Sequence, residues 1–143
     1  MSFKDHFSQQ AADYARFRPR YPRALFEFIA ATAPNHSLAL DCATGSGQAA
    51  IALSEFFHSV IALDASAAQI ASAQPNDRVE YRVAPAESTG LSTHSVSAIT
   101  VAQALHWFNL TTFNVEACRL LQPGGVLAAW AYNHLRISPE IDL

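Results

Sequence analysis

Hydrophobic positions along the chain follow two different spacings, which separate candidate strands from candidate helices. Residues 38–42, 60–64, 98–102 and 126–132 form nearly continuous apolar runs, and residues 79–83 alternate between apolar and polar. Continuous runs are typical of strands that are buried on both faces of a sheet. The pattern therefore predicts five strands, most of them inside a parallel sheet.

Apolar residues three or four positions apart lie before and between these runs, and this spacing predicts helices. An amphipathic helix is predicted before Pro19, and a second begins at Pro22 and ends before Pro34. The remaining helices are predicted over 48–57, 66–73 and 110–121, the second of these with Ser66 as its N-cap. Strands separated by helices form βαβ units with right-handed crossovers. The predicted fold class is α/β with a doubly wound parallel sheet.

Composition and charge narrow the class of protein. The chain has 143 residues, of which 50% are hydrophobic and 15% charged, and its net charge is −3. The length fits one folded domain, and the charge gives no basic surface for nucleic acid or anionic lipid. No apolar run approaches the roughly 20 residues of a membrane span, and no signal peptide is visible. We expect a cytoplasmic protein without a nucleic-acid or membrane partner.

Cysteine and histidine positions give no sign of a metal site. Cys42 and Cys118 lie far apart and predict neither a disulfide framework nor a CxxC motif. Both are expected in the core, one in a strand and one in a helix. The histidines likewise lack the spacing of metal ligands, so no metal is predicted.

The residues at the ends of the first two strands carry candidate binding chemistry. In doubly wound sheets, ligands bind outside the carboxyl ends of the strands, where the strand order reverses. The first strand leads through Asp41 into a loop with Gly45 and Gly47, and the second ends at Asp64, 19 residues after Gly45. Glycines allow a ligand to approach closely, and the Asp64 carboxylate can accept hydrogen bonds from two ribose hydroxyls. This combination predicts a nucleoside-containing cofactor.

Two cofactor classes compete for such a site. Residues 45–50, Gly-Ser-Gly-Gln-Ala-Ala, satisfy the G-x-G-x-x-G/A pattern of dinucleotide-binding domains. Asp41 argues against that class, because its carboxylate would repel a pyrophosphate but attract the ammonium and sulfonium groups of S-adenosylmethionine. We therefore favour S-adenosylmethionine. A nicotinamide dinucleotide-binding domain and a module that binds S-adenosylmethionine or S-adenosylhomocysteine without catalysis stay open as alternatives.

Several segments, in the right order, resemble the class I S-adenosylmethionine-dependent methyltransferases and their methyltransferase type 11 domain. Residues 40–48, Leu-Asp-Cys-Ala-Thr-Gly-Ser-Gly-Gln, resemble the first motif of that superfamily. Later motifs are resembled by residues 62–66, 84–87 and 120–127. More narrowly, residues 3–7, 14–22 and 103–108 are similar to the subgroup of trans-aconitate methyltransferase.

The resemblance implies an overall architecture. The sheet would have a Rossmann-like strand order of 3-2-1-4-5, and the chain would stop before the final β-hairpin of the seven-stranded methyltransferase fold. Residues 1–36 would form an N-terminal helical lid, and residues 37–143 the cofactor-binding core. The fifth strand would then be an exposed apolar edge, through which two copies of the chain could pair.

The resemblance also assigns cofactor contacts. Asp41 would lie under the methionine ammonium, and Asp64 would bind the ribose hydroxyls. The other implied cofactor contacts are Ala43, Gly45 and Gly47 in the loop, Ala65, Ala86 and Glu87 around the adenine, and Gln103 near the reactive methyl. Ala43 stands where the family usually has a glycine, and we expect its methyl group to demand a negative φ and to weaken binding.

His106 is the candidate catalytic residue, because it follows the fourth strand directly. It would serve as a general base for a carbon acid, a phenol or an ammonium acceptor, whereas a carboxylate acceptor needs none. A packed, hydrogen-bonded histidine is the structural alternative. Candidate substrate contacts are Tyr14, Arg18, Tyr21 and Trp107. An arginine could hold an acidic substrate, although a solvated arginine face is the alternative. The expected function is methyl transfer to a small molecule, with a carboxylic acid as one candidate.

Overall fold

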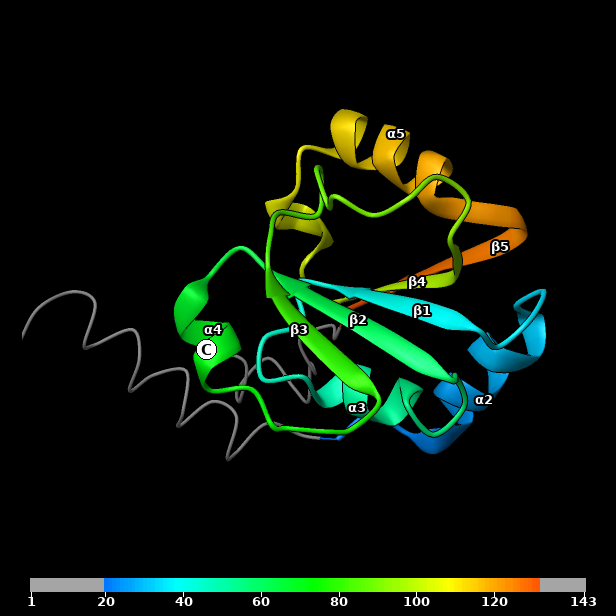
Figure 1. The fold of residues 1–143 in the computed structure, drawn as a ribbon, viewed down its shortest axis with the longest axis horizontal. Helices are drawn as coiled ribbons and strands as arrows, with labels where there is room; N and C mark the ends of the chain where they lie inside the picture. Colours follow the sequence, from blue (N-terminus) through cyan, green and yellow to red (C-terminus); the bar gives the residue numbers. More distant parts are fainter. Residues whose placement is uncertain (1–19, 132–143) are drawn as a thin grey trace, which may run out of the picture.

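The computed structural model describes residues 20–131, which form a five-stranded parallel sheet with helices on both faces (Figure 1). The strands are β1 (Leu38–Cys42), β2 (Ser59–Asp64), β3 (Val79–Val83), β4 (Val96–Ala102) and β5 (Leu121–Trp130). The helices are α2 (Arg23–Thr32), α3 (Gln48–Leu53), α4 (Ala67–Ala71) and α5 (Leu110–Leu120), with a 3-10 turn, η1 (Leu105–Trp107), before α5. The order β3-β2-β1-β4-β5 confirms the predicted α/β, Rossmann-like topology.

Two apolar layers, one on each face of the sheet, stabilise this arrangement. On one face, Phe26 of α2 and Leu53 of α3 pack against the sheet, and on the other face Phe113 and Leu120 of α5 do so (Figure 1). Every residue of β4 is buried. Because the central strands are covered on both sides, they lack the alternation of a half-exposed strand.

The ends of several elements differ from the sequence prediction. The helix predicted before Pro19 lies outside the described residues. The helix predicted over 66–73 is shorter, although the Ser66 hydroxyl accepts a hydrogen bond from the backbone N–H of Gln69 and so caps it as predicted. β5 begins at Leu121, before the predicted run at 126–132, because Pro123-Gly124-Gly125, which has the composition of a turn, continues the strand through a register shift. Such a bulge lets one strand carry extra residues without losing its pairing.

The segment expected to form a lid has two parts in the structure. Residues 1–19 lie outside the described residues. Residues 23–32 form α2, whose Phe26, Ile29 and Ala30 are buried in the apolar layer beneath the sheet. This part of the segment is therefore packed into the core.

The two cysteines have different environments. Cys42 is buried in β1, and burial together with the charges of Asp41, Glu87 and Glu116 raises the pKa of its thiol. It is therefore an inert thiol of the core. Cys118 is exposed on α5, so its predicted core position is wrong. The amphipathic helix turns this position away from the sheet, whereas Phe113 and Ala117 face inward.

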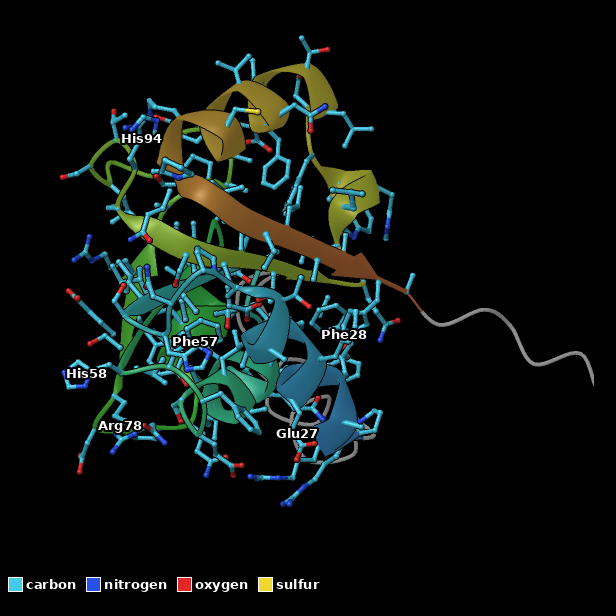
Figure 2. The ribbon with its side chains drawn as sticks, turned by 90° about the vertical axis from the view of Figure 1, so that its right-hand side faces the viewer. Glu27, Phe28, Phe57, His58, Arg78 and His94 are labelled. Atoms are coloured by element: carbon cyan, nitrogen blue, oxygen red, sulfur yellow. The ribbon has the colours of Figure 1, made fainter. Side chains whose placement is uncertain are left out.

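His58, Arg78 and His94 all lie near the amino ends of strands. Figure 2 shows them on one side of the molecule, opposite the arrowhead of β5. His58 precedes β2, Arg78 precedes β3 and His94 lies just before β4. These side chains are therefore remote from the carboxyl ends at which such sheets bind ligands.

A buried carboxylate fastens α5 to the loop before β4. Glu116 accepts hydrogen bonds from the backbone N–H of Thr89 at 2.7 Å, from the Thr89 hydroxyl at 2.8 Å, and from Nε of Arg119 at 2.7 Å. The Arg119 hydrogen bond is the largest cause, and the two from Thr89 add to it, so that the pKa of Glu116 is lowered from 4.5 to about 2. The ionised form is thus favoured in the folded chain.

This pKa shift predicts acid sensitivity. Because Glu116 titrates at about 2 in the folded chain and near 4.5 when unfolded, its contribution is complete above pH 4.5 and lost as the pH falls toward 2. Because the Arg119 side chain is partly exposed and its charge is screened by solvent, we expect Glu116→Gln to lower the free energy of unfolding by roughly 1–2 kcal/mol at pH 7 and by about half as much at pH 3. Urea unfolding of both chains at each pH measures the difference. A difference that is independent of pH would contradict the prediction.

No helix within residues 20–131 is both long and apolar enough to cross a bilayer.

Candidate functional site

The loop between β1 and α3 turns by means of left-handed backbone at alternate residues. Ala43, Gly45 and Gly47 have φ values of 53°, 58° and 89°. The expectation of a negative φ at Ala43 is therefore wrong. The turn is fixed by hydrogen bonds from the Thr44 N–H to the Leu63 carbonyl, 2.8 Å, and from the Gly47 N–H to the Thr44 carbonyl, 2.9 Å. Alanine takes this conformation at a cost of roughly 1–2 kcal/mol.

Asp64 connects this loop to the carboxyl end of β2. Its Oδ2 accepts a hydrogen bond from the backbone N–H of Gly45 at 3.0 Å, and its Oδ1 accepts one from the N–H of Ser66 at 2.9 Å. Ser66, rather than Asp64, caps α4. Asp64 is half-buried, and each carboxylate oxygen has a second lone pair. The side chain can therefore hold the loop and accept hydrogen bonds from a ligand at the same time.

Asp41 lies beneath the loop and is buried, with 1% of its surface exposed. The Thr44 hydroxyl donates a hydrogen bond to its Oδ2, and the Thr100 hydroxyl of β4 donates one to its Oδ1, both at 2.6 Å. Oxygen–oxygen distances of this length are typical of hydroxyl donors to an ionised carboxylate. Asp41 therefore places a held negative charge at the end of β1.

Tyr81 of β3 is a residue of this region that the sequence did not reveal. A Cβ added to Gly47 would lie 2.2 Å from the Tyr81 hydroxyl oxygen, so the phenol occupies the space that a side chain would need. The hydroxyl donates to the Gln74 carbonyl at 2.6 Å. Burial and the charge of Asp41 raise the pKa of Tyr81 to about 12, so it is neutral at pH 7. The sequence alone does not place Tyr81 beside Gly47, because this contact depends on how β3 lies next to the loop after β1.

The residues predicted to surround the adenine follow β2 and β3 at the same edge of the sheet. Ala65 is exposed next to Asp64, Ala86 is buried and Glu87 is half-buried. The Ala84 N–H donates to the Asp64 carbonyl at 3.0 Å, which joins the loop after β3 to the end of β2. The two loops therefore start side by side.

Gln103 follows β4 and connects it with both β5 and the start of α2. Its φ is 58°, its backbone N–H donates to the Trp130 carbonyl at 2.7 Å, and its side-chain Nε2 donates to the Tyr21 hydroxyl at 3.1 Å. Tyr21 meets the Trp130 ring edge-on, with ring centres 5.4 Å apart. Non-glycine residues with positive φ are held by their surroundings and cluster at functional sites.

His106 and Trp107 lie in the turn η1, close after the carboxyl end of β4. Both are exposed, Trp107 to 78%, and their rings lie 4.8 Å apart. The structural alternative of a packed, hydrogen-bonded histidine does not fit this exposed ring, because in η1 it is Leu105, and not His106, that packs against the apolar layer. Both side chains are accessible to a substrate.

The predicted substrate contacts are only partly described. Tyr14 and Arg18 lie outside the described residues. Tyr21 is buried and lines a cavity of about 560 Å³ between the start of α2 and the start of α3, with Ser46 on its wall. Arg23 lines the same cavity but forms ion pairs with Glu27 and Glu55. Asp41, Asp64 and Glu87 are not among the residues that line it.

The fold and these strand ends define a nucleoside-cofactor-binding α/β domain. Residues 40–129 match the family described as methyltransferase domain, and the chain belongs to this family. The chain is 41% identical over 141 residues to a putative methyltransferase of Dictyostelium discoideum, which covers 98% of the chain. This family match confirms the class I superfamily, with S-adenosylmethionine as its cofactor, that the sequence predicts.

Solved structures show the same fold. A putative type II methyltransferase from Anaeromyxobacter dehalogenans is 52% identical, with a TM-score of 0.81 over 88% of this chain. Geranyl diphosphate C-methyltransferase from Streptomyces coelicolor, solved with Mg²⁺, geranyl diphosphate and S-adenosyl-L-homocysteine, is 22% identical with a TM-score of 0.66 over 76% of the chain, and so supports the fold. The chain spans 54% of the Dictyostelium and Anaeromyxobacter proteins and 45% of the Streptomyces protein.

Proposed function

We propose that this chain binds S-adenosylmethionine at the carboxyl ends of β1 and β2 and takes part in methyl transfer to a small molecule. The observation that carries the proposal is the Asp64 carboxylate, which lies half-buried between the Gly45 and Ser66 N–H groups. A carboxylate held in this way presents its remaining lone pairs to vicinal hydroxyls. Asp41 places a second negative charge beneath the same loop.

The surrounding residues fit this cofactor better than a dinucleotide. The ammonium of S-adenosylmethionine gains from the charge of Asp41, whereas a pyrophosphate would be repelled by it. We infer that Ala43, Gly45 and Gly47 border the methionine half and the ribose. Ala65, Ala86 and Glu87 would adjoin the adenine, and Gln103 would lie near the reactive methyl.

The bound cofactor would supply a sulfonium-linked methyl group with a good leaving group. The chain's own contribution is then to bind, to orient and to exclude water. Exposed His106 is proposed to accept a proton from an acidic C–H, phenol or ammonium acceptor. A carboxylate acceptor would use the site without it.

We infer that the methyl acceptor is a small molecule, with a carboxylic acid as the first candidate. We also infer that the chain belongs to the subgroup of methyltransferases similar to trans-aconitate methyltransferase. Within the segment 1–36, in which α2 is packed into the core, we propose that the residues before α2 act as a lid, with Tyr14, Arg18 and Tyr21 on its substrate side and exposed Trp107 opposite. The hydrogen bond between Gln103 and Tyr21 supports a link between this segment and the site. A cytoplasmic location fits such a substrate.

Calorimetric titration of the chain with S-adenosylhomocysteine and, separately, with NADH tests the cofactor proposal. We expect binding of the first and none of the second; the reverse result would overturn it in favour of a dinucleotide-binding domain. Incubation with S-adenosylmethionine and a panel of small acids, read by mass spectrometry for a gain of one methyl group, tests the reaction. Binding without methylation of any acceptor would favour the non-catalytic module.

We also propose that two copies of the chain pair along β5. Among the described residues, 20–131, this strand is the last in the sheet order, and Leu127 is 43% exposed on it. An open apolar edge favours pairing with another strand. Light scattering should show a dimer. Leu127→Lys should convert the dimer to a monomer, whereas Val115→Lys, at an exposed position of α5, should leave the dimer intact. A monomeric unmodified chain would contradict the proposal.

A further inference from the structure

A single row of side chains crosses the whole sheet at the level of Asp41. The strand registers pair Tyr81 with Ala62, Ala62 with Asp41, Asp41 with Thr100, and Thr100 with Ala128. Ala62, Tyr81 and Ala128 all belong to the apolar layer under α2 and α3, so Asp41 and Thr100 share that face. Within the row, Asp41 is therefore flanked by a small apolar residue on β2 and a hydroxyl on β4.

The Thr100 hydroxyl is directed at the Asp41 carboxylate. Thr100 is completely buried, and its Oγ1 lies 2.6 Å from Oδ1 of Asp41. The other oxygen, Oδ2, takes the Thr44 hydroxyl at the same distance. One hydroxyl on each oxygen fixes the plane of the carboxylate, because rotation about the Cβ–Cγ bond would break both hydrogen bonds.

Another buried hydroxyl of β4 shows that this contact is specific. Ser97 is also completely buried, but its Oγ donates to the backbone carbonyl of Leu38 at 2.8 Å. Ser97 thus joins β4 to β1 without touching a charged group. The buried hydroxyl of Ser97 therefore has a structural role, whereas that of Thr100 acts on the Asp41 carboxylate.

We propose that Thr100 is a positioning residue for the cofactor: it orients the Asp41 carboxylate, and so favours ligands that carry the ammonium group of the methionine half. Thr44 holds the second carboxylate oxygen in the same way. The inference rests on the proposed function, in which Asp41 attracts that ammonium. It predicts that loss of the Thr100 hydroxyl changes which ligands bind, as well as how stable the fold is.

The test compares two ligands that share their adenosine and sulfur. S-adenosylhomocysteine carries the amino-acid ammonium, and 5′-methylthioadenosine lacks it. Thr100→Val removes the hydroxyl at nearly constant volume, and we expect it to weaken S-adenosylhomocysteine binding about tenfold, the range for one hydrogen bond to a charged group, and to change 5′-methylthioadenosine binding less than twofold. Thr100→Ser should restore binding of S-adenosylhomocysteine to within about threefold.

Ser97→Ala is the matched control, and it should change the affinity for neither ligand more than twofold. Isothermal titration gives the affinities, and thermal unfolding records the stability of each variant. If Thr100→Val does not fold, Thr44→Val carries the same expectation through the other oxygen. Equal losses for both ligands, or an unchanged affinity for S-adenosylhomocysteine, would overturn the inference alone. An unmodified chain that binds neither ligand would overturn the proposed function and the inference together.

Discussion

Replacing Asp64 by alanine should lower the affinity for S-adenosylhomocysteine about a hundredfold. The substitution would remove the proposed acceptor for two ribose hydroxyls, and a hydrogen bond to a charged group is worth about 1.5–3 kcal/mol. It would also release the Gly45 and Ser66 N–H groups from Oδ2 and Oδ1. Loop and ligand contacts are therefore lost together. Isothermal titration of the alanine variant gives the change.

Two further variants separate the parts of this effect. Ser66→Ala removes the cap of α4 but leaves the Asp64 carboxylate in place, so it should alter the affinity less than threefold. Asp64→Asn keeps the volume but turns an amide N–H₂ toward one backbone N–H, and we expect a loss close to that of alanine. An alanine variant with unchanged affinity would exclude Asp64 from the binding site.

Gly47→Ala should lower the free energy of unfolding by about 3 kcal/mol. One part is backbone strain, because Gly47 has φ of 89°, a conformation that costs an alanine roughly 1–2 kcal/mol. The other part is steric, because the new Cβ would lie 2.2 Å from the Tyr81 hydroxyl oxygen and 2.9 Å from two ring carbons. Overpacking of this kind costs about 1–3 kcal/mol. Urea unfolding measures the sum.

Gly90 supplies the matched control for backbone strain. Its φ is 76°, and an added Cβ would meet nothing within 4 Å. Gly90→Ala should therefore cost only the strain, about 1 kcal/mol. The loss in the double variant Gly47→Ala with Tyr81→Ala should be less than the sum of the two single losses, because removal of the ring relieves the clash. Equal losses for Gly47→Ala and Gly90→Ala would contradict the steric argument.

Much of the fold could be predicted because strands that are buried on both faces of the sheet consist of consecutive apolar residues. The runs at 38–42 and 79–83 coincide with β1 and β3. The start of β5 was misplaced because Pro123-Gly124-Gly125 has the composition of a turn, and only pairing with β4 shows it as a bulged strand. Cys118 was misplaced because helix periodicity alone did not set which face of α5 meets the sheet.

The residues of the candidate site could be predicted where their position at the end of a strand is enough to place them in the site. Asp41, Gly45 and Asp64 come at or just after the carboxyl ends of adjacent strands, so topology brings them together. Thr100 was missed because its contact depends on the register between β1 and β4, which are distant in sequence, and Tyr81 because its place beside Gly47 depends on how β3 lies next to the loop after β1. The backbone at Ala43 was mispredicted because hydrogen bonds of the loop override the local preference of alanine.

Asp64 places a constraint on how this site can diverge. The two Asp64 oxygens that shape the Gly45 loop are the same oxygens that we propose bind the ribose, so under this proposal one side chain determines both ligand choice and loop geometry. A change of nucleoside preference at this position would first require another acceptor for the Gly45 N–H. New specificities are therefore easier to acquire at exposed positions such as Trp107, whose replacement leaves the loop intact.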